Sequence, residues 1–266
     1  MYKRADIIYT YDGSYEGLLC CIYQSVTDKV IPADVTPESS LQMTLYPKKA
    51  IYTDFKIARK VEEGIRRKFS DDAYSLIELG YYTCHPYKER LIADFVRLAI
   101  EHGKKVVKML TNDTVNELQT AVKALTREAH QLMGFVRFTV YNSAMAAIIE
   151  PKNFVLPLLR EHFCDRYRNE TFIIYDKTHG AALIYRFGRS QIIAVDEFLQ
   201  PEAGENEVMY RSLWKLFYNT IAIQERENPK CRLQHMQKRY WKHLTEMSEL
   251  APACEKAGSL GIKLIK

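Results

Sequence analysis

Apolar residues recur every three or four positions in several stretches of the chain, which is the spacing of one face of an α-helix. The clearest stretch runs from about Thr114 to Met133 and ends at Gly134. Its apolar positions alternate in steps of three and four, as in a helix packed in a bundle: Val115, Leu118, Val122, Leu125, Ala129 and Leu132. We predict a core helix there. We predict further helices over residues 15–26, 54–69, 72–79, 86–103, 154–167 and 207–227, and a basic helical segment over 233–249.

In other stretches the apolar period is two, which is typical of strands. Residues 6–11 form one such stretch, and residues 135–141 and 144–150 flank a two-residue turn as the arms of a hairpin. Three more short strands, at 171–176, 181–187 and 191–196, are joined by turns short enough to require antiparallel pairing. Residues 28–52 have no clear period, so we expect a loop there with at most a short element at 42–45. The predicted fold class is α+β, with a mostly antiparallel sheet in two hairpin or meander groups, covered by several helices.

The chain of 266 residues is 47% apolar and 27% charged, which is typical of a globular protein. We expect a single α+β domain over residues 1–250, in which residues 200–250 are a basic helical subregion, and a loose tail over residues 251–266. No stretch approaches the roughly 20 apolar residues of a membrane span, and no secretory leader is recognisable. We therefore expect a cytoplasmic protein with no membrane partner.

Composition and motifs argue against several classes of function. The six cysteines form no CxxC pair, which argues against a zinc ribbon or an iron–sulfur motif in this chain, and we expect buried apolar thiols. Signatures of P-loop nucleotide binding, dinucleotide binding, zinc peptidases and serine hydrolases are absent from the sequence. The formal net charge of +5 favours a polyanionic partner, but only weakly.

The turn after the first predicted strand is a candidate anion or base seat, formed by Asp12, Ser14 and Glu16. Free backbone N–H groups at a helix start bind phosphate, but two carboxylates would repel it and suit a base edge, a proton transfer or a cation better. The alternative is ordinary capping of the helix by Ser14, with an acidic first turn. Both interpretations are open at this point.

Four charged residues are expected where the core helix meets the predicted hairpin: Glu128, His130, Arg137 and Glu150. A two-residue hairpin turn would place Arg137 opposite Ile148, with Glu150 as its diagonal neighbour on the same face of the sheet. One interpretation is a buried ion pair between Arg137 and Glu150. The other is a polar pocket in which Glu128, His130 and Glu150 are acid–base groups.

Between residues 226 and 243, many cations stand beside aromatic side chains, and Glu227 is the one acid among them. This clustering fits a surface that follows phosphates and stacks on bases. We assign nine residues to nucleic-acid binding: Arg137, Arg166, Lys230, Arg232, Lys238, Arg239, Tyr240, Trp241 and Lys242. Asp176 is a candidate for the same pocket as Arg166. The competing interpretation is a solvated basic helix whose aromatic residues pack on the body of the protein.

Four segments, taken in order, carry a resemblance to a known family: YDGSYEGLLCCIYQ (11–24), REAHQLMGFVRF (127–138), IEPKNFVLPLLREHFCDRY (149–167) and NPKCRLQHMQKRYWKHLTE (228–246). The family that they resemble is bacterial and uncharacterised, and is described as DNA metabolism or DNA repair proteins that accompany a radical-SAM protein. Related domains are joined to uracil-DNA glycosylase-like domains.

The resemblance implies a division of labour in which the partner carries the iron–sulfur cluster and SAM, and this chain carries no cofactor or metal. Gln131 and Gln237 depart from the pattern, because a basic residue and a proline are expected there. The resemblance implies no catalytic mechanism. It carries over ten positions: Asp12, Ser14, Glu16, Glu128, His130, Arg137, Glu150, Pro151, His162 and Arg166.

We therefore expect a DNA-binding protein of DNA metabolism or repair that is accessory to a radical-SAM partner. One alternative is an enzyme that acts on a nucleobase or a phosphodiester through Glu128, His130 and Glu150. Another is a protein-interaction scaffold without affinity for nucleic acid. The first expectation requires that the basic C-terminal segment and the charged corner around Glu128 lie along one open groove.

Overall fold

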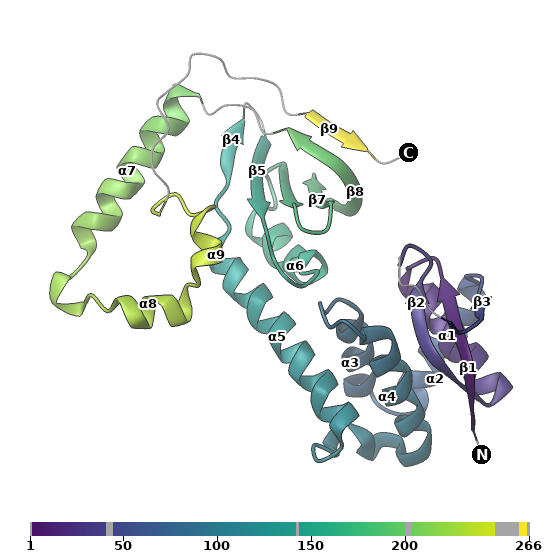
Figure 1. Cartoon of the computed structure of the whole chain (residues 1–266). Coiled ribbons are helices and arrows are strands. Elements are labelled where there is room, and N and C mark those ends of the chain that lie inside the picture. The colour runs from purple at the N-terminus through teal and green to yellow at the C-terminus, as the bar shows by residue number, and fades with distance from the viewer. Residues whose placement is uncertain (1, 41–44, 142–143, 200–203, 248–260, 265–266) are drawn as a thin grey trace. The chain divides into compact units, whose positions relative to one another are not determined.

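The computed structural model describes residues 2–40, 45–141, 144–199, 204–247 and 261–264 (Figure 1). It divides into two compact units, unit 1 over residues 1–125 and unit 2 over residues 126–266. The prediction of an α+β fold is confirmed. The expectation of a single domain over residues 1–250 stays a prediction, and each unit is described by itself.

Unit 1 begins with a three-stranded parallel sheet. Strand β1 lies in the middle and pairs in parallel with β2 on one side and with β3 on the other. Helix α1 connects β1 to β2 and packs on both strands. The bounds are β1 Lys3–Tyr11, α1 Tyr15–Asp28, β2 Val30–Pro37 and β3 Lys48–Ala50.

The prediction of a loop over residues 28–52 is wrong, because β2 and β3 lie within it. Strand β2 contains Pro32 and ends at Pro37, and most of its residues are only half-buried, so neither its composition nor its period resembles a strand. Its place at the edge of the sheet explains why prolines are tolerated there. The short element expected at 42–45 lies largely outside the described residues, with Leu45 in a bend.

The helices of unit 1 begin and end close to the predicted positions. Ser14 caps α1 by accepting a hydrogen bond from the Gly17 N–H at 2.9 Å, and Asp54 caps α2. The buried faces of these helices and of β1 form one apolar core. The bounds are α2 Phe55–Lys68, α3 Asp71–Tyr81, α4 Lys88–His102, the 3-10 helix η1 Gly103–Lys108 and α5 Asp113–Phe135, which continues into unit 2. All six apolar residues of the predicted core helix are buried in α5.

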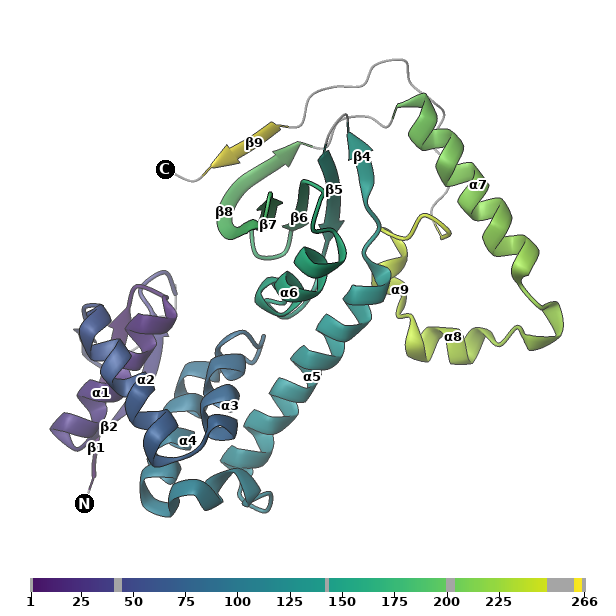
Figure 2. The ribbon, with the colours of Figure 1, turned by 180° about the vertical axis from the view of Figure 1, so that it is seen from behind.

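Unit 2 is built around a mixed sheet with the strand order β4-β5-β6-β7-β8-β9 (Figure 2). The predicted hairpin is β4 and β5, and the three predicted meander strands are β6, β7 and β8. The short strand β9 pairs antiparallel with β8. The bounds are β4 Thr139–Tyr141, β5 Ala144–Ile149, β6 Phe172–Asp176, β7 Ala181–Arg186, β8 Arg189–Leu199 and β9 Gly261–Leu264.

The "mostly antiparallel" detail of the prediction is only partly right. Strands β5 and β6 pair in parallel, with Ile149 beside Asp176, and the sheet of unit 1 is parallel throughout. Helix α6, Leu156–Arg166, supplies the long connection that a parallel pair needs, and it packs on β7 and β8. The carboxyl ends of β5 and β6 therefore lie side by side.

The C-terminal helices differ from the predicted ones. The helix predicted over 207–227 is α7, Glu205–Ile221, followed by the 3-10 helix η2, Gln224–Arg226. The predicted basic helix over 233–249 is two short helices, α8 Pro229–His235 and α9 Lys238–Trp241. Residues 251–260 and 265–266 of the predicted loose tail lie outside the described residues, whereas 261–264 form β9.

Helix α7 is unusually exposed for an apolar helix. Glu207 and Arg211 attach it to the edge strand β4, through the Val140 N–H and the Thr139 hydroxyl. Seven large apolar or aromatic side chains on α7 are 40–64% exposed: Met209, Tyr210, Leu213, Trp214, Leu216, Phe217 and Ile221. Within the described part of the chain, no helix combines the length and the apolar character needed to cross a membrane.

The start of α1 gives a test of the fold of unit 1. A Cβ atom at Gly17 would lie 2.8 Å from both Thr53 Oγ1 and a ring carbon of Tyr11, and closer still to Asp12. We expect Gly17→Ala to destabilise the protein by about 1–3 kcal/mol, through overpacking. Urea denaturation measures the change in unfolding free energy.

Gly64→Ala is the matched control, because nothing lies within 4 Å of a Cβ atom at that position in α2. Alanine at a helix interior should raise the unfolding free energy there by about 0.5–1 kcal/mol. Equal effects of the two substitutions would contradict the packing described at the start of α1.

Candidate nucleic-acid interface

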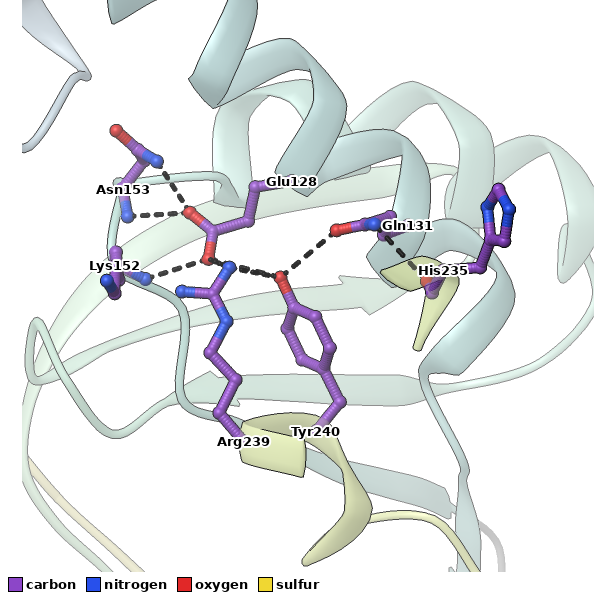
Figure 3. Close-up of polar contacts among 7 residues, drawn as sticks. All are labelled: Glu128, Gln131, Lys152, Asn153, His235, Arg239 and Tyr240. Carbon is purple, nitrogen blue, oxygen red and sulfur yellow. Dashed lines mark hydrogen bonds and ion pairs between the residues drawn. The ribbon is translucent and has the colours of Figure 1, made fainter. Parts of the chain in front are cut away.

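Glu128, near the end of α5, is the centre of a buried hydrogen-bond network (Figure 3). Its side chain is 3% exposed. One carboxylate oxygen accepts the Lys152 N–H at 3.0 Å, and the other accepts the Asn153 N–H at 2.9 Å and the Asn153 side-chain amide at 2.6 Å. Arg239 of α9 completes the set with an ion pair at 2.9 Å. The carboxylate is therefore fully engaged by its own chain, and these contacts close the corner around Glu128, so the open groove expected there from the sequence is not found among the described residues.

Tyr240 and Gln131 extend this network toward α8. The Tyr240 hydroxyl lies 3.4 Å from both Glu128 Oε1 and Gln131 Oε1, and the Gln131 amide donates to the His235 carbonyl at 3.3 Å (Figure 3). Burial raises the pKa of Tyr240 to about 12. The ring is 4% exposed and packs against Phe135, so Tyr240 has no free face on which a base could stack.

Glu150 directly follows β5 and is held by residues of the C-terminal segment. Its Oε1 atom lies 2.7 Å from Lys242 Nζ, 3.4 Å from His243 Nε2 and 3.7 Å from Lys177 Nζ. The hydrogen bond from Lys242 lowers the pKa of Glu150, and burial lowers the pKa of His243. At neutral pH Glu150 is a carboxylate bound to cations, which suits structural pairing better than acid–base exchange.

Arg137 does not pair with Glu150, so that interpretation of the corner is wrong. It lies just before β4, and it donates to Glu246 at 2.8 and 3.3 Å and to the Gly134 carbonyl at 2.7 Å. The register of the hairpin is as predicted, but β4 begins only at Thr139, so the strand does not hold Arg137 opposite Ile148. The partner, Glu246, is 109 residues away in the sequence.

Glu246 also holds Trp214, which lies in the middle of α7. The indole N–H donates to Glu246 Oε2 at 3.1 Å. The Glu246 side chain is 2% exposed; burial would raise its pKa, but the hydrogen bonds from Arg137 and Trp214 lower it overall. Arg137, Glu246 and Trp214 therefore form a connected group that joins the end of α5 to α7.

His130 and Asp176 do not join these groups. His130 is exposed on α5 and forms no hydrogen bond with a described residue, so the acid–base set of Glu128, His130 and Glu150 does not converge. Asp176 is fully buried and binds His179 Nδ1 at 2.6 Å in the turn after β6. It is not among the residues that surround Arg166, contrary to our interpretation.

An open pocket of about 590 Å³ lies where the end of α5, the second half of α6 and the first half of α7 come together. Its walls contain two kinds of side chain in particular. The basic ones are Arg137, His162, Arg166 and Arg211, and the aromatic ones are Phe138, Phe163, Tyr167, Tyr210 and Trp214. Pockets of this size are typical of small-molecule and cofactor sites.

The basic groups of the pocket differ in what already binds them. Arg211 donates to Glu207 at 2.9 Å and to the Thr139 hydroxyl at 2.6 Å. Arg166 is exposed and forms no ion pair with a described residue, and His162 makes no hydrogen bond with one. The Arg166 guanidinium lies 5.9 Å from the centre of the Tyr167 ring, and a ligand in the pocket could bind Arg166 and His162 without displacing a described carboxylate.

The remaining residues assigned to nucleic acid fall into two groups. Lys230 and Lys238 are exposed, Arg232 is half-buried, and none of the three forms an ion pair with a described residue. Trp241 is half-buried, with its indole N–H bound to the Met236 carbonyl at 3.1 Å. The C-terminal segment thus packs on the body of the protein through Tyr240 of α9, as the competing interpretation held, and leaves Lys230 of α8 and Lys238 of α9 exposed.

The candidate anion or base seat in unit 1, formed by Asp12, Ser14 and Glu16, is the N-terminal cap of α1. One oxygen of Asp12 accepts both the N–H and the hydroxyl of Ser14, and the other accepts the Thr53 hydroxyl at 2.8 Å. Burial would raise the pKa of Asp12, but these hydrogen bonds lower it overall. Glu16 lies in the first turn of α1. These contacts favour the capping interpretation of the turn.

Cysteine and carboxylate positions give no sign of a metal centre. Among the described residues, no group of three or more His, Cys, Asp or Glu side chains is arranged to hold a metal ion. Cys20 and Cys21 are buried as expected, but Cys84 and Cys231 are exposed, so the expectation of buried thiols holds only in part.

Residues 86–246 match the model of a family described as "Domain of unknown function (DUF4130)". The chain belongs to the DUF4130 family. The DUF4130 segment contains the pocket and the hydrogen-bond networks of the buried carboxylates Glu128 and Glu246. The Asp12 cap lies before this segment. No curated protein and no solved structure matches the chain. The prediction of an uncharacterised family is confirmed, while the link to DNA repair and to a radical-SAM protein stays a prediction.

Several residues of the pocket were missed in the sequence. Tyr210, Arg211 and Trp214 belong to the helix predicted over 207–227. No binding or catalytic role is predicted for these three residues from the sequence. The sequence does contain one signal: apolar and aromatic residues occur on more than one face of that helix. A helix that only packs on a core needs a single apolar stripe, so the additional apolar residues indicate a further contact surface. Nothing in the sequence indicates that Glu246 joins Arg137 to Trp214.

The network around Glu128 predicts a structural effect of substitution. We expect Glu128→Gln to lower the unfolding free energy by about 1–3 kcal/mol, because Arg239 loses its charged partner and a buried N–H group loses its acceptor. His130→Ala, two residues further on the exposed face of α5, should change it by less than about 0.5 kcal/mol. Urea denaturation of the two variants checks this, and equal effects would contradict the assignment of Glu128 to the fold.

Proposed function

We propose that this DUF4130 protein binds nucleic acid in DNA metabolism or repair, and that the pocket of unit 2 is the binding site. One observation carries the proposal: arginine, histidine and aromatic side chains line the same open pocket of about 590 Å³. Arginine binds phosphate through paired N–H groups, and aromatic rings stack on bases of any sequence. A nucleotide needs both kinds of contact at once.

The available cations support this proposal. Arg166 at the pocket, and Lys230 and Lys238 in the C-terminal helices of the same unit, are exposed and form no ion pair with a described residue. Such cations can exchange their bound counterions for the phosphates of a polynucleotide, which makes the binding dependent on salt. Arg239 and Lys242, by contrast, are held by Glu128 and Glu150, so we do not include them among the phosphate contacts.

We do not propose catalysis through Glu128, His130 and Glu150. Glu128 is saturated with hydrogen bonds, Glu150 is bound to cations, and His130 contacts neither carboxylate. A general acid or base must be within hydrogen-bond reach of the proton it transfers. The arrangement therefore supports binding better than it supports this set of acid–base groups.

We further propose that the protein is cytoplasmic and works beside a radical-SAM partner, which carries the iron–sulfur cluster and SAM. The resemblance stated above supports this proposal. So does the face of α7 opposite the pocket, because exposed apolar side chains in this number are typical of protein interfaces. We take Leu213 and Leu216 as the centre of this α7 face.

Removal of one free cation tests the proposal of nucleic-acid binding. We expect Arg166→Gln to weaken binding of a labelled oligonucleotide severalfold and to reduce the slope of log affinity against log salt by about 0.7–0.9, the value for one phosphate contact. Fluorescence anisotropy at several salt concentrations measures both quantities. Lys60→Gln, which removes an exposed cation from α2 of unit 1, is the control and should change neither. Wild-type binding that is independent of salt would contradict the proposal.

Introduction of a negative charge on the apolar face of α7 tests the partner. We expect Leu213→Glu and Leu216→Glu to reduce co-purification with a co-expressed radical-SAM protein, because both side chains are more than half exposed and apolar. Ile100→Glu on α4, a position 42% exposed, should leave co-purification unchanged. Equal yields of the partner with all three variants would exclude the α7 face as the interface.

A further inference from the structure

We propose that Trp214 is the stacking platform of the pocket and that its ligand is an unpaired nucleotide, so that the protein prefers single-stranded nucleic acid to duplex. This inference rests on the proposed function and gives it a ligand class. It is carried by the contacts that fix the Trp214 ring at the wall of the pocket.

Trp214 combines exposure with a fixed orientation. Its side chain lines the pocket and is 40% exposed, although most of α7 makes few contacts with the body of unit 2. The indole N–H is bound to Glu246 Oε2 at 3.1 Å, and Glu246 is bound in turn to Arg137 by two hydrogen bonds. The ring therefore needs little further ordering when a planar ligand stacks on it, which lowers the entropic cost of binding.

The other tryptophan and the buried tyrosine are less suited to this role. Trp241 is half-buried, with its N–H bound to the Met236 carbonyl at the end of α8. Tyr240 is 4% exposed and packs on Phe135. From the sequence, Tyr240 and Trp241 were predicted to stack on bases. Trp214, on another helix, is better suited to this contact.

The opposite side of the pocket can bind the phosphate of the same nucleotide. Arg166 and His162 come from the second half of α6 and line the pocket, and neither is bound to a described carboxylate. Arg137 lies 6.0 Å from the centre of the Trp214 ring, so a cation also stands close to a base stacked there. The pocket thus offers a ring for the base and cations for the phosphate.

A concave site with an aromatic wall selects against duplex. Bases within a duplex are covered on both faces by their neighbours, and their extrusion costs a few kcal/mol. An unpaired base has free faces and enters such a site without this cost. We therefore expect tighter binding of a single strand than of the same sequence annealed to its complement.

Tryptophan fluorescence separates this inference from general affinity, because the chain contains only two tryptophans. In the Trp241→Phe variant the emission comes from Trp214 alone, and we expect single-stranded oligothymidylate to quench it strongly. In the matched Trp214→Phe variant, where Trp241 remains, the same titration should cause little quenching. The corresponding duplex should quench neither variant strongly.

Affinity gives the second measurement. Loss of one base–aromatic stack by Trp214→Ala should weaken binding of the single strand about 5- to 150-fold in fluorescence anisotropy, whereas Trp214→Phe should retain most of it. Far-ultraviolet circular dichroism establishes that each variant is folded. If Trp214→Ala is unfolded, the quenching comparison between the two Phe variants decides the question.

The outcomes distinguish the two proposals. Wild-type protein that binds the single strand with salt dependence, but without quenching of Trp214, would overturn the inference and leave the proposed function in place. Equal quenching by duplex and by single strand would overturn the preference for an unpaired nucleotide. Wild-type protein that binds neither form of DNA at low salt would overturn both proposals.

Discussion

A carboxylate removed from water must be surrounded by donors, and this requirement organises unit 2 around Glu128. The donors come from two parts of the chain that are far apart in sequence: the loop between β5 and α6, with Lys152 and Asn153, and the short helix α9, with Arg239. The charge on α5 therefore holds the C-terminal segment against the end of the helix. Tyr240 and Leu244, which follow Arg239 in the chain, are buried, so the segment contributes to the core as well as to the ion pair.

The attachment at Glu128 determines what the following residues do. Once α9 is fixed, Glu246 lies within reach of both Arg137 and Trp214 and joins the end of α5 to the exposed helix α7. Lys242 and His243 reach Glu150 at the carboxyl end of β5 in the same way. A segment that has the composition of a nucleic-acid surface is thus used largely for internal contacts. The cations available to a ligand are Arg166 on α6, Lys230 on α8 and Lys238 at the start of α9.

Local features of the sequence predicted the local features of the fold. The apolar steps of α5 mark its buried face correctly, and the register of β4 and β5 is the one predicted from the sequence. What could not be predicted depends on partners distant in the chain. The parallel pairing of β5 and β6 requires the position of α6, the edge strand β2 is hidden by its prolines, and the pairing of Arg137 with Glu246 spans 109 residues. For the candidate site, the sequence identified Arg137 and Arg166 but not the contribution of Tyr210 and Trp214 from α7.

The basic side chains of unit 2 therefore have two different roles. The role of each one depends on whether a carboxylate of the same chain already binds it. If Arg239 moved to a phosphate, the buried carboxylate of Glu128 would be left as an unpaired charge in an apolar environment. The free-energy cost of that unpaired charge exceeds what a surface ion pair contributes. Arg166 has no such constraint. Arg137, another engaged cation, holds Glu246 in place, and Glu246 holds the Trp214 ring. The engaged charges of this protein thus serve its binding surface indirectly, because they orient an aromatic side chain that would otherwise move freely on an exposed helix.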